Sequence, residues 1–99
     1  MFTIRFAKGV EKDLKALKAY DRARVVDAIE THLSHAPTTP ARNRKLLVSL
    51  IPPWTAEPPV WELRAGTLRV FYDVSVQEQI VYVRAIRRKA AGETTGDIL

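Results

Sequence analysis

Hydrophobic and polar residues alternate with a period of two in several parts of the chain. At the N-terminal end, "FTIRFA" places Phe2, Ile4 and Phe6 on one side and polar residues on the other. A period of two is typical of β-strands that bury one face. The pattern predicts a first strand at residues 2–7 and three further strands at 60–64, 67–74 and 80–86.

Between residues 8 and 36 the period lengthens to that of an α-helix. Val10, Leu14 and Leu17 recur at helical spacing, with lysines outside their stripe. Asp21 is a suitable N-cap for a second helix, which Pro37 and the following prolines would end. The buried stripe of this second helix would consist of Val25, Val26, Ile29 and Leu33. The sequence therefore predicts a helical hairpin, with helices in 8–20 and 21–36, behind the first strand.

The remaining segments have the composition of connections. Residues 41–47 are basic and then apolar, and residues 48–59 hold four of the six prolines, which indicates a surface loop. Residues 87–99 form a basic tail. We expect one domain over residues 1–99 with an α+β fold of order β-α-α-β-β-β. Its sheet should be mainly antiparallel, with the two-helix hairpin packed on one face.

A hairpin turn at Ala65-Gly66 would pair Glu62 with Arg69, and the next hairpin would pair Arg69 with Arg84. The face covered by the helices would then hold Trp61, Leu63, Leu68, Val70, Tyr72, Val81, Val83 and Ala85. A shift by one residue would bury the arginines, so burial disfavours it. The opposite, uncovered face would hold Arg5, Glu62, Arg64, Arg69, Phe71, Tyr82 and Arg84.

Composition limits the possible functions. The chain has 99 residues, a formal net charge of +5 and no cysteine. Without thiols or an apolar run of membrane length, we expect a cytoplasmic protein that contacts no membrane. His32 and His35 have no third ligand nearby, so we expect neither a metal site nor a cofactor.

The excess positive charge is concentrated on the predicted open face. A solvated face that keeps the protein soluble would by itself explain a charge of this size, with Glu62 and Arg69 as a cross-strand ion pair. However, Arg64, Arg69 and Arg84 would lie on neighbouring rungs, where like charges repel unless an anion binds. Arg87, Arg88 and Lys89 continue this positive charge, and Phe71 and Tyr82 would offer rings for stacking. Phosphate-binding cations beside aromatic rings are typical of single-stranded RNA recognition.

The segments "WELRAGTLRVFYDV" and "IVYVRAIRRK", after a strand, two helices and a proline-rich loop, resemble the RelE/ParE toxin superfamily of bacterial type II toxin–antitoxin modules. The "KLL" at 45–47 also stands where that superfamily has Lys-Leu before the sheet. The resemblance covers nearly the whole chain. It implies a toxin that an acidic antitoxin neutralises. RelE-like members cut mRNA in the ribosomal A site, whereas ParE-like members inhibit DNA gyrase.

The resemblance also implies roles for individual residues. Arg69 matches the arginine that contacts the scissile phosphate, and Arg88 or Lys89 matches the basic position after the last strand. Glu62 stands where RelE-like nucleases commonly have a lysine, and the tail has no tyrosine. The catalytic candidates are thus Arg69, Arg88, Lys89 and Glu62. The RNA-binding candidates are Arg64, Arg84, Arg87, Phe71, Tyr82 and Lys45.

Three functions follow as hypotheses. The first is a ribosome-dependent mRNA endonuclease, whose partners would be the ribosome, mRNA and an acidic antitoxin. The second is a non-catalytic inhibitor of DNA gyrase. The third is a catalytically degenerate member that retains only antitoxin binding.

Overall fold

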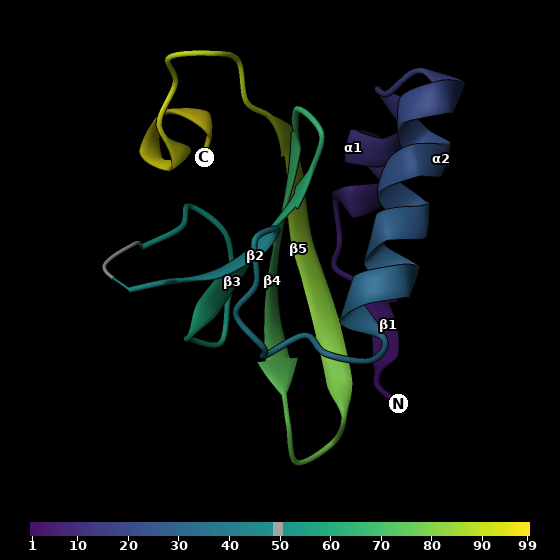
Figure 1. Cartoon of the computed structure of the whole chain (residues 1–99), viewed down its shortest axis with the longest axis vertical. Coiled ribbons are helices and arrows are strands. Elements are labelled where there is room, and N and C mark those ends of the chain that lie inside the picture. Colours follow the sequence, from purple (N-terminus) through teal and green to yellow (C-terminus); the bar gives the residue numbers. More distant parts are fainter. Residues whose placement is uncertain (49–50) are drawn as a thin grey trace.

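The computed structural model of the chain describes residues 1–48 and 51–99. It has one five-stranded sheet in the order β1-β5-β4-β3-β2, in which β1 is parallel to β5 and the other neighbours are antiparallel (Figure 1). The strands are β1 Thr3–Phe6, β2 Arg44–Leu47, β3 Val60–Ala65, β4 Leu68–Ser75 and β5 Ile80–Arg88. The predicted α+β class and element order are confirmed, and the structure adds β2 at one edge.

Two helices lie against one face of this sheet (Figure 1). They are α1 Val10–Lys15 and α2 Ala19–Ala28, and α2 continues into the π-helical turn η1 Ile29–Leu33. The second helix begins earlier than predicted, with Lys18 rather than Asp21 at the N-cap. Val25, Ile29 and Leu33 are fully buried and belong to the same core as Leu63 and Val70. This core fixes the helices against the sheet. No helix among the described residues is long and apolar enough to cross a membrane.

The predicted register of the first hairpin is wrong by two residues. Ala65 pairs with Leu68, so the turn is formed by Gly66 and Thr67, and Gly66 has a positive φ of 64° that favours glycine. Arg69 therefore lies opposite Arg64, and Glu62 is not its partner but lies opposite Phe71. Because the shift is even, each side chain still lies on its predicted face.

A β-bulge changes the second hairpin. Tyr72 pairs with Val83, but Phe71 pairs with Ala85, which leaves Arg84 as the extra residue. The bulge reverses the alternation along the rest of β5. Ala85 therefore joins Phe71 on the face away from the helices, so its predicted place in the helix-side core is wrong. The predicted Arg69–Arg84 pair is also wrong, because Arg69 pairs with Arg87.

The face away from the helices is not open, contrary to the prediction. The C-terminal tail ends in a short helix, η2 Thr95–Ile98, and lies on this side of the sheet (Figure 1). Ile98 packs with Phe71 and Ala85 in a second, smaller core. Leu47, Trp54 and Leu99 pack against it. Trp54 belongs to the predicted proline-rich loop 48–59, of which residues 49 and 50 lie outside the described residues.

Candidate anion-binding site

Three arginines lie side by side across the sheet. Arg69 in β4 pairs with Arg64 in β3 and with Arg87 in β5, so the three residues form one row on the face away from the helices. We call these residues the arginine row. Like charges at directly opposed positions are destabilising unless something compensates them. The row therefore concentrates positive charge at the end of the sheet next to the Gly66 turn.

Arg69, at the centre of the row, is held by the backbone and not by a carboxylate. Its side chain is only 8% exposed, and its Nη1 donates to the carbonyl oxygens of Gly66 (2.7 Å) and Leu68 (3.0 Å). Its buried Nε has no hydrogen-bond partner among the described residues. Desolvation, and next the charge of Arg64, lower the pKa of Arg69, while Glu62 acts in the opposite direction. Its charge is thus incompletely compensated, which an incoming anion would correct.

The two outer arginines differ from each other. Arg87 donates through Nη1 to Oδ2 of Asp13 in α1 (3.0 Å), and its guanidinium lies 5.4 Å from the ring centre of Trp54. The same Asp13 oxygen accepts from the backbone N–H of Ile86, so helix and strand are joined at this point. Arg64, in contrast, is exposed, and its guanidinium makes no hydrogen bond or ion pair with any described residue, although its backbone N–H donates to the Asn43 carbonyl (2.7 Å).

Glu62 lies on the same face but serves the tail. It is 3% exposed, and its Oε2 accepts a hydrogen bond of 2.9 Å from the Thr95 hydroxyl. Its Oε1 lies 3.8 Å from Nζ of the exposed Lys45, which is a weak contact for an ion pair. The arrangement fixes η2 to the sheet and closes off the carboxylate from solvent.

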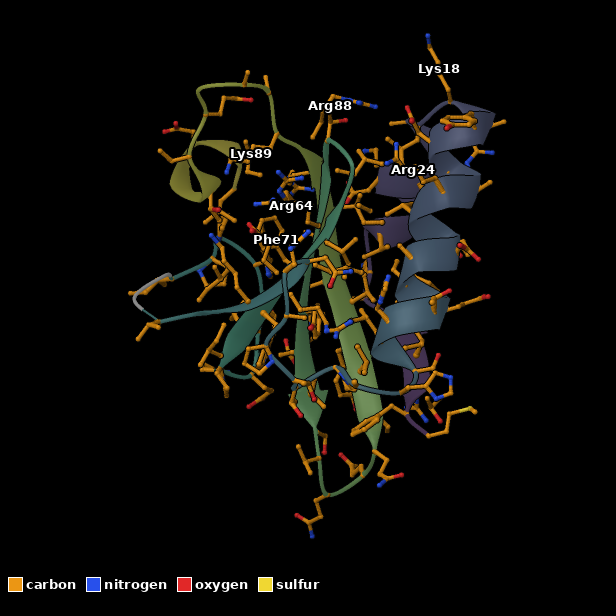
Figure 2. All side chains as sticks on the ribbon, viewed as in Figure 1. Lys18, Arg24, Arg64, Phe71, Arg88 and Lys89 are labelled. Atoms are coloured by element: carbon orange, nitrogen blue, oxygen red, sulfur yellow. The ribbon has the colours of Figure 1, made fainter. Side chains whose placement is uncertain are left out.

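The two basic residues at the end of β5 separate. Arg88 lies on the helix side, where it donates to Asp21 (3.0 Å) and to the Thr67 hydroxyl (2.9 Å). The bulge causes this placement, so the structure does not bring Arg88 into the row. Lys89 is half-buried, its backbone N–H donates to the Thr67 carbonyl, and Figure 2 shows it with Arg64 on the tail side.

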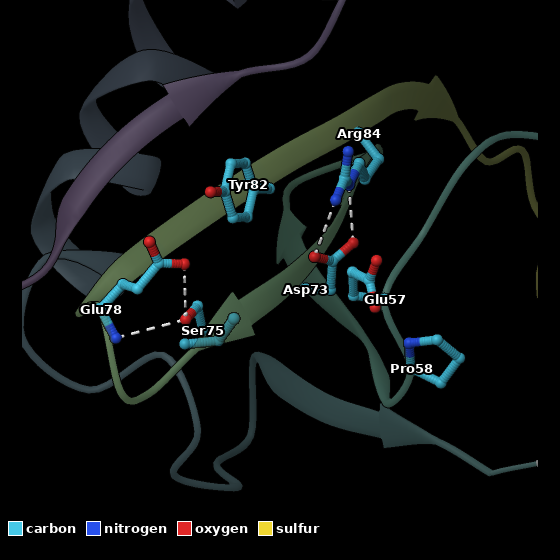
Figure 3. Close-up of a pocket in the computed structure, with 8 residues that line it drawn as sticks. Glu57, Pro58, Asp73, Ser75, Glu78, Tyr82 and Arg84 are labelled. Carbon is cyan, nitrogen blue, oxygen red and sulfur yellow. Dashed lines mark hydrogen bonds and ion pairs between the residues drawn. The ribbon is translucent and has the colours of Figure 1, made fainter.

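The other predicted RNA-binding residues lie elsewhere on this face. Arg84 donates to both carboxylate oxygens of the buried Asp73, at 2.7 and 3.1 Å, and lies 4.8 Å from the ring centre of Tyr82 (Figure 3). These three residues line a cavity of about 500 Å³ together with Glu57. The hydrogen bond to Asp73 raises the pKa of Arg84. Phe71 is fully buried, with its ring centre 5.4 Å from that of Trp54, so its face is not available for stacking here.

Two residues that build the site were not predicted from the sequence. Thr95, which binds Glu62, follows Thr94 in "TTGD", and that segment forms a capping box with Asp97. A Ser/Thr-x-x-Asp/Glu spacing is a recognisable helix start, so this signal was present in the chain. Asp13, the partner of Arg87, has no such signal, because its position in the helix does not distinguish it from the other acidic residues there.

Comparisons with known proteins agree with this architecture. Residues 4–91 match the family model of the ParE toxin of the type II toxin-antitoxin system, parDE. The search of curated proteins gives no match.

Several solved structures share the fold. The toxin–antitoxin complex RelBE2 from Mycobacterium tuberculosis matches at 24% identity and a TM-score of 0.70, covering 89% of this chain and 98% of that one. The archaeal RelE–RelB complex from Pyrococcus horikoshii matches at 16% identity and 0.68, covering 92% and 98%. The isolated RelE toxin of E. coli matches at 13% identity and 0.62, covering 94% and 89%.

Proposed function

Because the chain belongs to the ParE toxin family of type II toxin–antitoxin systems, we propose that it stops translation by cutting mRNA on the ribosome, as RelE-like toxins do. Membership confirms the resemblance to the RelE/ParE superfamily. The observation that carries the proposal is the incompletely compensated charge of Arg69 at the centre of the arginine row. Arginine is the preferred partner of phosphate, and the Arg69 Nε, which is buried and has no partner among the described residues, would become available to a phosphate group if the tail moved away.

The row suits the chemistry of RNA cleavage. The ribose 2′-OH gives up its proton and attacks the adjacent phosphate, and negative charge grows on the phosphate oxygens in the transition state. The bond to the 5′-oxygen of the next nucleotide then breaks, which leaves a 2′,3′-cyclic phosphate, and the 5′-oxygen takes up a proton. Arg69 would stabilise that charge from a fixed position, which is the largest contribution that such sites usually make, and the exposed Arg64 would assist it. We keep Lys89 as the candidate for proton transfer, since arginine stays protonated. We assign Glu62 the structural role of anchoring the tail through Thr95.

The second candidate is a non-catalytic inhibitor of DNA gyrase. The observation that favours it is the burial of Glu62, which removes the predicted carboxylate from any proton transfer while the tail is in place. In that function the arginine row would bind an acidic surface or DNA phosphate without cutting it. A degenerate member that only binds an antitoxin is the third possibility.

Mapping transcript 5′ ends after a brief induction distinguishes these functions. We expect new ends in phase with codons in the wild-type strain and none with Arg69→Gln expressed at an equal level. Intact messages together with gyrase-linked DNA breaks would contradict the proposal and support the second candidate. Growth arrest without new transcript ends and without gyrase-linked DNA breaks would contradict both candidate functions.

We further propose a cognate antitoxin that is acidic and partly disordered when free. Such a segment would order on binding and neutralise the basic surface. Because charge would steer the encounter, its association rate should fall as salt rises from about 50 to about 500 mM, over which the Debye length shortens about threefold. Stopped-flow binding measures this, and a rate that does not respond to salt would contradict electrostatic steering.

A further inference from the structure

Arg24 in α2 packs directly on the Gly66 turn. A Cβ atom at Gly66 would lie 2.8 Å from the Arg24 Cζ, a distance that real contacts do not reach. Gly66 also has a positive φ, so the turn favours glycine at this position, and the absence of a side chain there leaves room for the Arg24 guanidinium. Arg24 comes from the helix side of the sheet (Figure 2), whereas Arg69 reaches the same glycine from the other side. The Gly66 turn is thus the place where the helix-covered face of the sheet and the opposite face meet.

The charge of Arg24 is unpaired. It makes no hydrogen bond or ion pair within residues 1–48 and 51–99, whereas Arg84, Arg87 and Arg88 each bind an aspartate. Two guanidinium groups therefore contact Gly66, one above and one below, and neither has a carboxylate partner. An anion at this turn would therefore meet two guanidinium groups that no carboxylate already neutralises.

An exposed aromatic ring accompanies Arg24 on the same helix. Tyr20 precedes Arg24 by four residues in α2, so the two side chains share one face of the helix. Tyr20 is 75% exposed, and it is the one large exposed hydrophobic side chain within residues 10–33. An apolar partner helix would need several such residues in a stripe. A single exposed ring beside a single free guanidinium instead fits a nucleotide, whose base stacks and whose phosphate pairs.

We propose that Tyr20 and Arg24 form an RNA-binding subsite that extends the arginine row around the Gly66 turn. A base would stack on Tyr20, its phosphate would bind Arg24, and the backbone would continue to Arg64 and Arg69. The inference rests on the proposed function, since it names a further part of the RNA path. It adds an aromatic group on the helix side, where the predicted stacking residues Phe71 and Tyr82 do not lie.

The test is the binding of a fluorescent, 2′-O-methylated single-stranded RNA of about 12 nucleotides, followed by anisotropy between about 50 and 200 mM salt, a range over which phosphate contacts weaken measurably. Tyr20→Ala should weaken binding about fivefold or more, and Tyr20→Phe should bind like the wild type, because stacking needs the ring only. Arg24→Gln should reduce the salt slope by about 0.7, the value for one lost phosphate contact on a single strand.

Arg5→Gln is the matched control. It removes the same group from an exposed position of β1, which pairs with the opposite end of β5 from the turn. If Tyr20→Ala and Arg24→Gln bind no more weakly than Arg5→Gln while Arg69→Gln binds weakly, the subsite is refuted and the proposed function stands. If the wild type binds RNA no better than Arg69→Gln, the arginine row makes no RNA contact and the subsite that extends it is refuted as well, while the mapping of transcript 5′ ends decides the proposed function separately. Variants that lose only antitoxin binding would also overturn the RNA assignment and make this surface a protein contact.

Discussion

Arg84 and Arg69 lie on the same face of the sheet, in two strands that pair with each other, but their surroundings are opposite. Arg84 donates to both oxygens of the buried Asp73, and this contact raises its pKa. Arg69 donates to two backbone carbonyls, and desolvation lowers its pKa. The Arg84 guanidinium has a carboxylate partner in its own chain, whereas the Arg69 guanidinium is positioned without a carboxylate hydrogen-bond partner.

This difference separates a structural arginine from a binding arginine. A matched pair at low exposure stabilises the fold as long as both members are present. A guanidinium that only neutral carbonyls hold has a fixed position, and no carboxylate neutralises its charge. Such a group is suited to bind an anionic ligand. A structural arginine and a binding arginine cannot be distinguished by residue type or by the face of the sheet on which they lie.

The largest effect should follow from breaking the matched pair. Asp73→Ala would leave Arg84 charged, largely buried and unpaired, and we expect the free energy of unfolding to fall by about 3–5 kcal/mol. Urea denaturation followed by circular dichroism measures it. The double variant Asp73→Leu with Arg84→Met should be far less destabilised, because no charge is left unpaired. A loss below about 1 kcal/mol for Asp73→Ala would contradict the comparison.

Removing the unmatched arginine should affect activity and not the fold. Arg69→Gln should reduce single-turnover cleavage on programmed ribosomes by about 100- to 1000-fold, the usual loss when one preorganised donor is removed. Arg69→Lys should also be impaired, since a point charge replaces a two-pronged donor. Arg5→Gln serves as the charge-matched control. An Arg69→Gln protein that is folded and fully active would eliminate the arginine row as the site.

Much of the fold follows from periodicity, and the site follows only in part. The alternation in β3 and β4 assigned Arg64 and Arg69 to the correct face although the register was wrong, because an even shift preserves sidedness. The bulge at Arg84 is different, since one extra residue reverses every later side chain. That reversal brought Arg87 into the row and moved Arg88 out of it.

The covered face was also missed, for a physical reason. Alternation indicates which residues share a face, but it does not reveal whether a distant segment packs on that face. Ile98 and Leu99 are an isolated apolar pair at the end of the tail, and their partner Phe71 is far away in the sequence. Only the capping box at Thr94 and Asp97 pointed to order in the tail.

A smaller effect is expected at Glu62. Glu62→Gln keeps an oxygen that can accept from Thr95. It removes the weak contact with Lys45 and the minor charge interaction with Arg69, so we expect less than about 1 kcal/mol loss of stability and nearly unchanged cleavage. If Glu62 were the general base, the same substitution would lower the rate of the cleavage step by about two to four orders of magnitude. Such a loss with unchanged mRNA binding would make Glu62 catalytic and would reverse our assignment.

The smallest effect concerns the tail that covers the Arg69 end of the face. The backbone N–H of Thr94, and next its side chain, lower the pKa of Asp97 below its usual value. A group whose pKa is lower in the folded chain stabilises the fold above its unfolded pKa, which is about 4 for aspartate, and loses that contribution as the pH falls through the folded value. The tail should therefore keep its cap at neutral pH and loosen in acid. NMR titration of the Thr94 and Asp97 amide shifts tests this, with Asp97→Asn as the variant in which the acid transition disappears. An identical transition in Asp97→Asn would assign it to another carboxylate and remove the cap as its cause.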